Sequence, residues 1–191
     1  MAPALPPLTV PALALPGWVR GWLARRAGSP LRGDDARMAL VIGLAAENAR
    51  RGSGGPFGAA VFERRSGRLV AAGVNCVTAS GLSWAHAEMV AIALAQRARG
   101  GYDLGARGLP AHELVTSSEP CAMCFGATPW SGVARLVCGA RAADAEAIGF
   151  DEGPKPRGWV RALAARGIEV VRDVRRAEAV AALRSYGGPI Y

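Results

Sequence analysis

The chain has 191 residues and a formal net charge of +8, with about half of its residues hydrophobic and a fifth charged. This composition fits one globular domain and excludes a disordered chain. No apolar run approaches the ~20 residues that a membrane-spanning helix needs. The proline-rich start also lacks the charged and unbroken apolar stretches of a secretory signal, so we expect a cytoplasmic protein that does not bind membranes.

The positive charge is a candidate signal for nucleic-acid binding. Its carriers are almost all arginines, with Lys155 as the one lysine, and they are scattered along the chain. Abundant Ala, Gly and Pro indicate that a GC-rich coding sequence produces this bias. Because a nucleic-acid-binding surface gathers its charge on one face, we do not expect a nucleic-acid partner.

The first predicted segment is a proline-rich arm over residues 1–33, with one short amphipathic turn near Trp18 and Trp22. The domain proper is predicted at 34–191. It begins with a helix that is capped by Asp34 or Asp35 and ends before Gly52. A hairpin follows, with strands at 56–62 and 69–74.

A loop over 75–84 leads into a region where predicted helices and strands alternate. The helices are expected at 86–99, from 121, at 142–147, at 160–166 and at 175–186, and the strands at 114–116, 136–139 and 168–171. An opening hairpin followed by this alternation predicts a three-layer α/β domain with a mixed sheet.

The four cysteines, at positions 76, 121, 124 and 138, do not suit a disulfide framework in a chain of this length. A C-x-x-C pair in a protein expected to be cytosolic indicates metal or redox chemistry instead. Cys138 lies in an apolar predicted strand and is expected to be a buried structural thiol. Cys76 has no assigned role.

Two motifs carry the chemistry: His86-Ala87-Glu88 and Pro120-Cys121-Ala122-Met123-Cys124. Each stands at the predicted start of a helix, from where side chains can meet in one cavity. His86, Cys121 and Cys124 are ligands of types that suit Zn²⁺, and three protein ligands leave a fourth position for water. A helix N-terminus also lowers the pKa of a cysteine, which favours the thiolate that a metal needs.

Glu88 lies two residues after His86, in the same first helical turn. Deamination needs a group that takes a proton from water and passes protons to the ring and to the leaving amine, and Glu88 is the expected shuttle. The pattern H-x-E followed by P-C-x-x-C is the signature of zinc deaminases. Either half alone is weak evidence, whereas both in this order are specific.

Three alternatives stay open at this point. Cys121 and Cys124 could be a redox pair at a helix N-terminus, and Glu88 could be an ordinary acidic residue of a first helical turn. The chain could also be a zinc-stabilised binding protein without catalysis. His112, the second of two histidines, is expected to be a solvated or strand-end residue and not a ligand.

Residues 34–191 resemble the cytidine-deaminase-like superfamily and, within it, the bacterial guanine deaminases. The resemblance rests on 55–59, Asn75, 85–88, 118–124 and Trp130, and most diagnostically on 144–152. It implies an α/β/α sandwich with a mixed five-stranded sheet, Zn²⁺ as cofactor, a homodimer, and hydrolysis of guanine to xanthine and ammonia in purine catabolism. Ammeline-type aminotriazines are further candidate substrates, and a nucleoside or tRNA base (guanosine, cytidine or adenosine) is the alternative.

The same resemblance implies how the base is held. Asn75 would hydrogen-bond the heterocycle, and Glu152 would face its N–H edge and could relay a proton, since an ionised carboxylate only accepts hydrogen bonds. The other expected substrate contacts are Phe57, Ala87, Trp130 and Tyr191. Members of this branch close the pocket with the C-terminal segment, and a tip that ends on Tyr191 after two glycines suits a lid.

Two residues depart from the expected pattern near this pocket. Trp84 is bulky where a small residue is expected, and Pro129 lies inside the helix that starts at Cys121. Proline removes a helical hydrogen bond and bends the helix. Both residues are expected to reshape the pocket.

Overall fold

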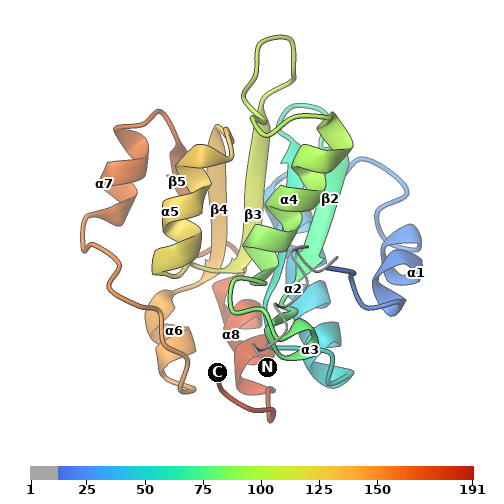
Figure 1. Cartoon of the computed structure of the whole chain (residues 1–191), viewed down its shortest axis with the longest axis vertical. Coiled ribbons are helices and arrows are strands. Elements are labelled where there is room, and N and C mark those ends of the chain that lie inside the picture. Colours follow the sequence, from blue (N-terminus) through green and yellow to red (C-terminus); the bar gives the residue numbers. More distant parts are fainter. Residues whose placement is uncertain (1–12) are drawn as a thin grey trace, which may run out of the picture.

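The computed structural model describes residues 13–191, so the first part of the arm, residues 1–12, lies outside the described residues. The elements follow in the order α1 (Trp18–Ala24), α2 (Asp34–Arg50), β1 (Gly58–Glu63), β2 (Leu69–Val74), α3 (Val77–Ser80), α4 (Ala87–Arg99), β3 (His112–Ser118), α5 (Ala122–Trp130), β4 (Arg135–Ala140), α6 (Ala142–Glu146), α7 (Trp159–Ala164), β5 (Glu169–Val171) and α8 (Arg176–Arg184) (Figure 1).

The five strands form one mixed sheet in the order β2-β1-β3-β4-β5. β1 pairs antiparallel with both β2 and β3, whereas β3, β4 and β5 run parallel. The predicted mixed five-stranded sheet is therefore confirmed. The opening hairpin supplies its antiparallel part, and the helical crossovers supply its parallel part.

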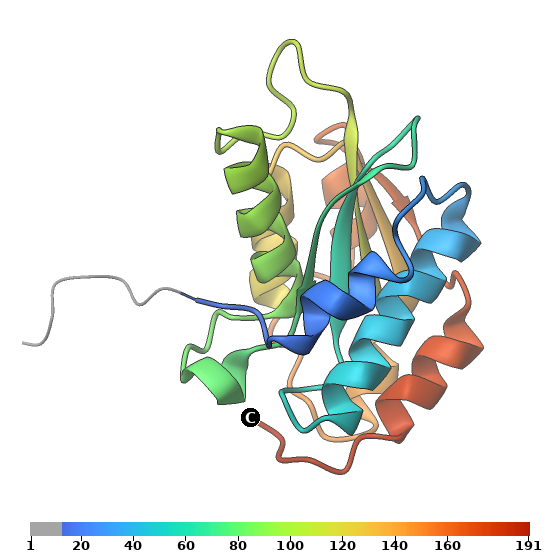
Figure 2. The ribbon, with the colours of Figure 1, turned by 90° about the vertical axis from the view of Figure 1, so that its right-hand side faces the viewer.

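Helices cover both faces of the sheet, as the view along its edge shows (Figure 2). In β1, Ala60 and Phe62 join the hydrophobic cluster under α2 and α8, while Ala59 and Val61 join the cluster under α4 and α7. Because a strand buried on both faces needs apolar residues, β1 is apolar from Gly58 to Phe62, without polar alternation. The α/β/α sandwich expected from the resemblance is confirmed.

The predicted arm contains α1, which is packed on the domain. Val19 and Trp22 are buried and belong to the cluster under α2. The sequence indicated a single turn near Trp18 and Trp22, and the helix extends that turn to Ala24. The short helix α3 falls in the segment that was predicted to be a loop.

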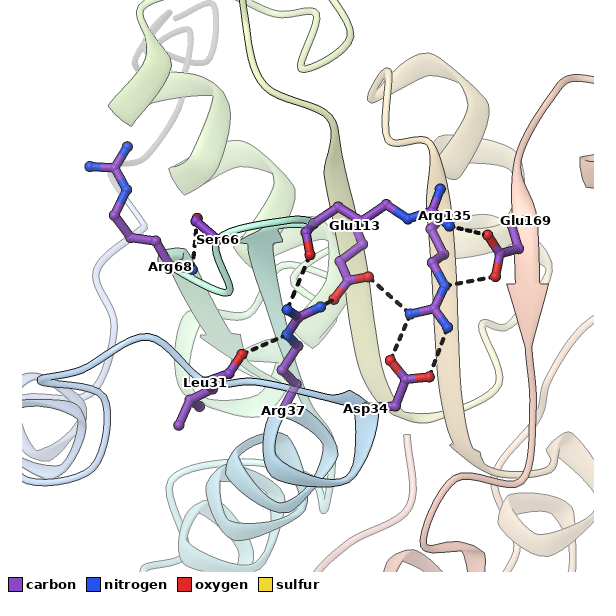
Figure 3. A network of polar contacts seen from close by, with 9 residues as sticks. Leu31, Asp34, Arg37, Ser66, Arg68, Glu113, Arg135 and Glu169 are labelled. Atoms are coloured by element: carbon purple, nitrogen blue, oxygen red, sulfur yellow. Dashed lines mark hydrogen bonds and ion pairs between the residues drawn. The ribbon is translucent and has the colours of Figure 1, made fainter.

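A buried ion-pair network ties the amino ends of the parallel strands to α2 (Figure 3). Glu113, fully buried at the start of β3, pairs with Arg37 of α2 and with Arg135 of β4. Arg135 also donates two hydrogen bonds of 2.7 Å to Asp34 and one of 3.0 Å to Glu169. These bonds hold the pKa of Asp34 below its usual value. Part of the arginine excess is thus used inside the fold.

Among the helices of residues 13–191, none has the length and apolar character needed to cross a membrane.

Candidate active site

The two motifs meet where α4 and α5 begin. His86 is the N-cap residue of α4 and Cys121 is the N-cap residue of α5, and both have extended backbone conformations. Cys121 follows the carboxyl end of β3, so the sheet fixes the start of α5 beside α4. Side chains from both helix starts therefore face one common space, as the sequence predicted.

His86, Cys121 and Cys124 form a compact donor set. Their ligand atoms all lie within 4.8 Å of one another, and the Cys121 Sγ is 3.6 Å from the His86 Nδ1. A tetrahedral zinc with Zn–N near ~2.0 Å and Zn–S near ~2.3 Å places N and S about 3.5 Å apart. The donor types and their spacing fit zinc.

The electrostatics of the two thiols support the same conclusion. Hydrogen bonds from Cys124 and then from His86 lower the pKa of Cys121 to about 4, against the opposing effect of burial. The shared proton and burial raise the pKa of Cys124. Thiolate charge is thereby concentrated beside an imidazole nitrogen, which is the environment of a metal-binding cysteine.

Glu88 stands in the first turn of α4 and is buried, with 6% of its surface exposed. Its Oε1 accepts a hydrogen bond of 3.2 Å from the Thr116 hydroxyl. Burial, followed by the charge of Cys121, raises the pKa of Glu88. A buried carboxyl group with a raised pKa beside a metal site can hold and release a proton, which an ordinary solvated helix-start residue does not offer.

The donor set opens into a small cavity of about 90 Å³. Five of the residues that line it beside His86 and Cys121 were singled out in the sequence: Phe57, Asn75, Glu88, Glu152 and Tyr191. These five candidates, which span more than 130 positions of the chain, thus surround one cavity.

The side-chain amide of Asn75 has a fixed orientation. Its Oδ1 accepts hydrogen bonds from the backbone N–H groups of Gly55 (3.4 Å) and Val77 (3.2 Å). Since the oxygen is occupied, the Nδ2 group is the part left for a ligand. Asn75 therefore offers the cavity a hydrogen-bond donor.

Glu152 lies in the loop before α7 and is 6% exposed. Its Oε2 is buried and has no hydrogen-bond partner among the described residues. Burial, followed by the charge of Cys121, raises the pKa of Glu152 to about 8. Because buried polar atoms are nearly always paired, this unpaired oxygen in the cavity wall indicates a place for a ligand's N–H group.

Aromatic rings close the cavity on the side of the tail. Phe150 contacts Phe57 at a centroid distance of 4.8 Å and Tyr191 at 5.4 Å, both edge to face. Tyr191 comes from the same chain, and burial raises the pKa of its hydroxyl. The C-terminal segment thus lines the pocket through Tyr191.

Several expected residues lie elsewhere. Trp130, at the far end of α5 from Cys121, is 77% exposed and stacks against Arg166. Ala87 is fully buried in the core under α4. Neither side chain lines the cavity, because α5 carries Trp130 about 13 Å along its axis away from the ligands and the Ala87 side chain packs against the sheet.

Trp84 and Pro129 do not line the cavity either. Trp84 packs against the core cluster under α2, and α5 continues through Pro129 to Trp130. The expectation that they reshape the pocket is therefore not supported by their positions.

The remaining histidine and cysteines are accounted for in the structure. His112 is the first residue of β3, which agrees with the strand-end alternative, and it is fully buried and not solvated. Its Nδ1 lies 2.8 Å from the Leu104 carbonyl oxygen, and its Nε2 accepts a hydrogen bond from Arg99. Cys138 is buried in β4, as predicted, and Cys76 donates its thiol proton to the Val74 carbonyl.

Three lining residues were not predicted: Glu119, Phe150 and Asp151. Glu119 lies in the segment 118–124, and Phe150 and Asp151 lie in 144–152. Both segments carry the family resemblance, so the sequence contained a signal for these positions. Glu119 forms ion pairs with Arg172 and, at 3.7 Å, with Lys155, partners that lie far along the chain. Only the fold reveals such contacts.

Residues 32–140 match the family described as the cytidine and deoxycytidylate deaminase zinc-binding region. The guanine deaminase of Bacillus subtilis is 40% identical over 112 residues, which cover 59% of this chain and 67% of that protein. A solved structure of guanine deaminase from Nitrosomonas europaea is 50% identical with a TM-score of 0.86, covering 93% of this chain and 96% of the other.

A variant of the protein NE0047 has also been solved in complex with 8-azaguanine. It is 50% identical to this chain with a TM-score of 0.85, and the match covers 93% of this chain and 97% of the other. The zinc donor set, the buried glutamate and these similarities agree. The chain belongs to the cytidine and deoxycytidylate deaminase family of zinc-binding enzymes, and it is a zinc-dependent hydrolytic deaminase.

Proposed function

We propose that the substrate is guanine, which the enzyme hydrolyses to xanthine and ammonia. The observation that carries this proposal is the unpaired Oε2 of Glu152 in the same cavity as the donor group of Asn75. Guanine presents carbonyl and ring-nitrogen acceptors on one side and N–H donors on the other, so its edge complements one donor and one acceptor. The 8-azaguanine complex of a similar protein supports the same choice.

We propose that His86, Cys121 and Cys124 hold the zinc ion. When bound by three protein ligands, zinc supplies a water molecule whose pKa is lowered towards ~7. The further chemistry belongs to the side chains around it.

Glu88 moves the protons in this proposal. It takes one proton from the attacking water as the C–O bond forms at the amine-bearing carbon, and passes it to the neighbouring ring nitrogen. It then carries the hydroxyl proton of the tetrahedral carbon to the amine, so that the C–N bond breaks and neutral ammonia leaves. Its burial and its contact with Thr116 suit this role. Glu152, with a pKa of about 8, is a second group that can exchange a proton near neutral pH.

The size of the cavity favours a free base. Phe57, Phe150 and Tyr191 pack edge to face around a space of about 90 Å³, and the tail lies over it. A ribose would require the tail to leave. Ammeline presents a guanine-like face in one ring and is a further candidate.

Ammonia release from a panel of guanine, guanosine, ammeline, cytosine, adenine and cytidine tests the choice of substrate. We expect guanine to give the highest kcat/KM. Preferred turnover of guanosine or cytidine would contradict the proposal and favour a nucleoside deaminase. Salt-sensitive binding of tRNA would favour the RNA alternative.

We further propose a homodimer that acts in purine catabolism in the cytoplasm. Helix α5 carries no charged residue, yet Met123 and Trp130 on it are 38% and 77% exposed, which suits a face covered by a second copy. A reducing compartment would keep the ligand thiols of Cys121 and Cys124 free. Light scattering of the wild type and of Trp130→Glu tests the dimer: we expect two chains in the first and one in the second.

We also propose that an arm at 1–33, whose helix α1 packs on the domain, precedes a deaminase domain at 34–191 with a C-terminal lid. Limited proteolysis tests it. Cleavage confined to the first 33 residues, with the zinc-loaded remainder intact, is the expected result.

A further inference from the structure

A chain of side-chain hydrogen bonds connects α1 with the wall of the active-site cavity. The Trp18 Nε1 donates to the Ser53 Oγ at 3.0 Å, and the Ser53 hydroxyl donates to the Asn48 Oδ1 at 2.9 Å. The Asn48 Nδ2 then donates to two backbone carbonyls, those of Gly55 and Asn75, each at 2.9 Å. We name this set the Trp18–Ser53–Asn48 chain.

The donors and acceptors in this chain fit in one direction only. An indole N–H only donates, so the Ser53 oxygen must accept from Trp18. The hydroxyl proton of Ser53 is then free for the Asn48 oxygen. That contact turns the NH₂ group of Asn48 towards the two carbonyls, where both of its protons are used. The two carbonyls and the Ser53 hydroxyl thus favour the same orientation of the Asn48 amide, and Trp18 holds the Ser53 hydroxyl in place.

The two carbonyls belong to the segments that form the pocket wall. Asn48 is fully buried and Asn75 is 1% exposed. The backbone N–H of Gly55 donates in return to the Asn75 side chain, which leaves the Asn75 NH₂ group for the cavity. A side chain on Gly54 would overlap the Asn75 carbonyl oxygen and the Asn48 amide, so these segments are packed as closely as a glycine allows.

The same wall supports the tail. The hydroxyl of Tyr191 lies against Gly55, and Phe57 is two residues further along the chain. A shift of the Gly55 segment would therefore move the Asn75 NH₂ group and the aromatic rings of Phe57 and Tyr191 together. The zinc ligands and the proton carrier stand at the starts of other elements, α4 and α5: His86, Glu88, Cys121 and Cys124. Among the described residues, none of them makes a hydrogen bond to the side chains of Trp18, Ser53 or Asn48.

We infer that Trp18, Ser53 and Asn48 are positioning residues for substrate binding. They hold Asn75 and the Gly55 segment in the geometry that receives the base, which makes α1 part of the functional unit. The inference rests on the proposed deaminase function for its readout. The Trp18–Ser53–Asn48 chain supports the wall that binds the base and does not contact the proton carrier Glu88. Breaking these hydrogen bonds therefore raises KM more than it lowers kcat.

The test compares two substitutions on the same helix in the full-length, zinc-loaded enzyme. Trp18→Phe removes the indole donor and keeps an aromatic ring. Trp22→Phe is the matched control, since Trp22 is 6% exposed on α1 and makes no side-chain hydrogen bond among the described residues. We expect Trp18→Phe to raise KM about fivefold with kcat changed less than about twofold, as the loss of one hydrogen bond would give, and Trp22→Phe to lower Tm with KM unchanged.

Ser53 provides a second test that does not depend on α1 remaining folded. Ser53→Ala should raise KM to a similar extent, and Ser53→Thr, which keeps the hydroxyl, should restore it. An unchanged KM in Trp18→Phe and Ser53→Ala, or equal KM shifts in Trp18→Phe and Trp22→Phe, would overturn the inference.

KM is measured on the base that the wild type deaminates best in the panel. If that base is not guanine, the proposed substrate is wrong, but the ratio of KM between variants still tests the Trp18–Ser53–Asn48 chain. The failures of the two proposals are thereby distinguishable.

Discussion

The hydroxyl of Tyr191 occupies the space that a side chain on Gly55 would need. The contact joins the end of the chain to the segment between α2 and β1, and it closes the cavity above Asn75 and Glu152. Closing a pocket in this way excludes water from the reaction and holds the base.

Gly55→Ala should displace Tyr191 and open the pocket. We expect KM for guanine to rise about tenfold, the equivalent of losing about 1.4 kcal/mol of binding from aromatic burial. Steady-state kinetics check the result. Gly187→Ala, in the same tail, is the control because a methyl group there meets no neighbouring atom. Equal KM values in the two variants would show that the tail does not close on the substrate.

Glu152→Gln should remove an acceptor and a proton carrier without changing the shape of the side chain. We expect kcat/KM to fall by about 10²–10⁴, the usual contribution of a proton-transfer group, with zinc content unchanged. Asp151→Asn is the matched control, because Asp151 is an exposed neighbour whose carboxylate bonds to the backbone of Gly153. If kcat/KM falls more in Asp151→Asn than in Glu152→Gln, Asp151 and not Glu152 is the acid that acts on the base.

Metal content should distinguish the four cysteines. Elemental analysis should find about one zinc per chain, as one donor set of three allows, and Cys124→Ala should lose it. Cys76→Ala should keep it, since Cys76 is buried away from the donor set and bonds to the Val74 carbonyl. Removal of zinc by a chelator should lower Tm in the wild type. A wild-type protein without zinc would contradict the site, and so would a Cys76→Ala protein that has lost its zinc.

Glu63 should make stability depend on acid pH. Arg68, followed by Ser66 and Arg99, lowers its pKa from 4.5 to about 2 in the folded protein. A lowered folded-state pKa stabilises the protein above about pH 4.5, and this contribution is lost as the pH falls towards 2. Glu63→Gln should therefore lower the free energy of unfolding by about 1 kcal/mol at pH 7, because solvent weakens the pair with the exposed Arg68. The loss should be less than half as large at pH 3, as measured by urea unfolding.

Glu47→Gln is the control for this measurement. The pKa of Glu47 is also lowered to about 2, but both of its partners, Arg50 and Arg51, are exposed, at 65% and 40%. Glu63 pairs with the exposed Arg68 and also with Arg99, which is 18% exposed. Exposed ion pairs contribute little to stability. If Glu63→Gln and Glu47→Gln lower the free energy of unfolding equally, the burial of Glu63 beside Arg99 contributes nothing to stability.

The sequence predicted the parts of this protein that depend on local pattern. The helix at 34–50, the hairpin and the starts of α4 and α5 follow from periodicity and turns, and the signature fixed His86, Glu88, Cys121 and Cys124 as one group. The expected cap at Asp34 or Asp35 is wrong, because Gly33 is the N-cap residue of α2 and the Asp34 carboxylate pairs with Arg135 instead. A motif at a helix start carries its own geometry, because the backbone there determines where the side chain points.

Other features depend on contacts between distant residues. Ser53 and Trp18 are ordinary in the sequence and gain a role only because α1 packs beside α2. Trp130 and Ala87 show the converse, since they lie in or beside motifs while their side chains point to the surface and to the core. His112 was expected to be a solvated or strand-end residue. It begins β3, and the Leu104 carbonyl and Arg99 satisfy its ring nitrogens inside the fold, which the sequence does not show.

The central claim is that Glu88 moves the protons of a zinc-dependent deamination of guanine. The most direct measurement is ammonia release from guanine by the wild type and by Glu88→Ala, with zinc content determined on the same samples. The account predicts xanthine and ammonia in equal amounts from the wild type, and a loss of at least about 10³-fold in kcat in Glu88→Ala with zinc retained. A zinc-loaded Glu88→Ala protein that still deaminates guanine, or a zinc-loaded wild type that does not, would contradict it.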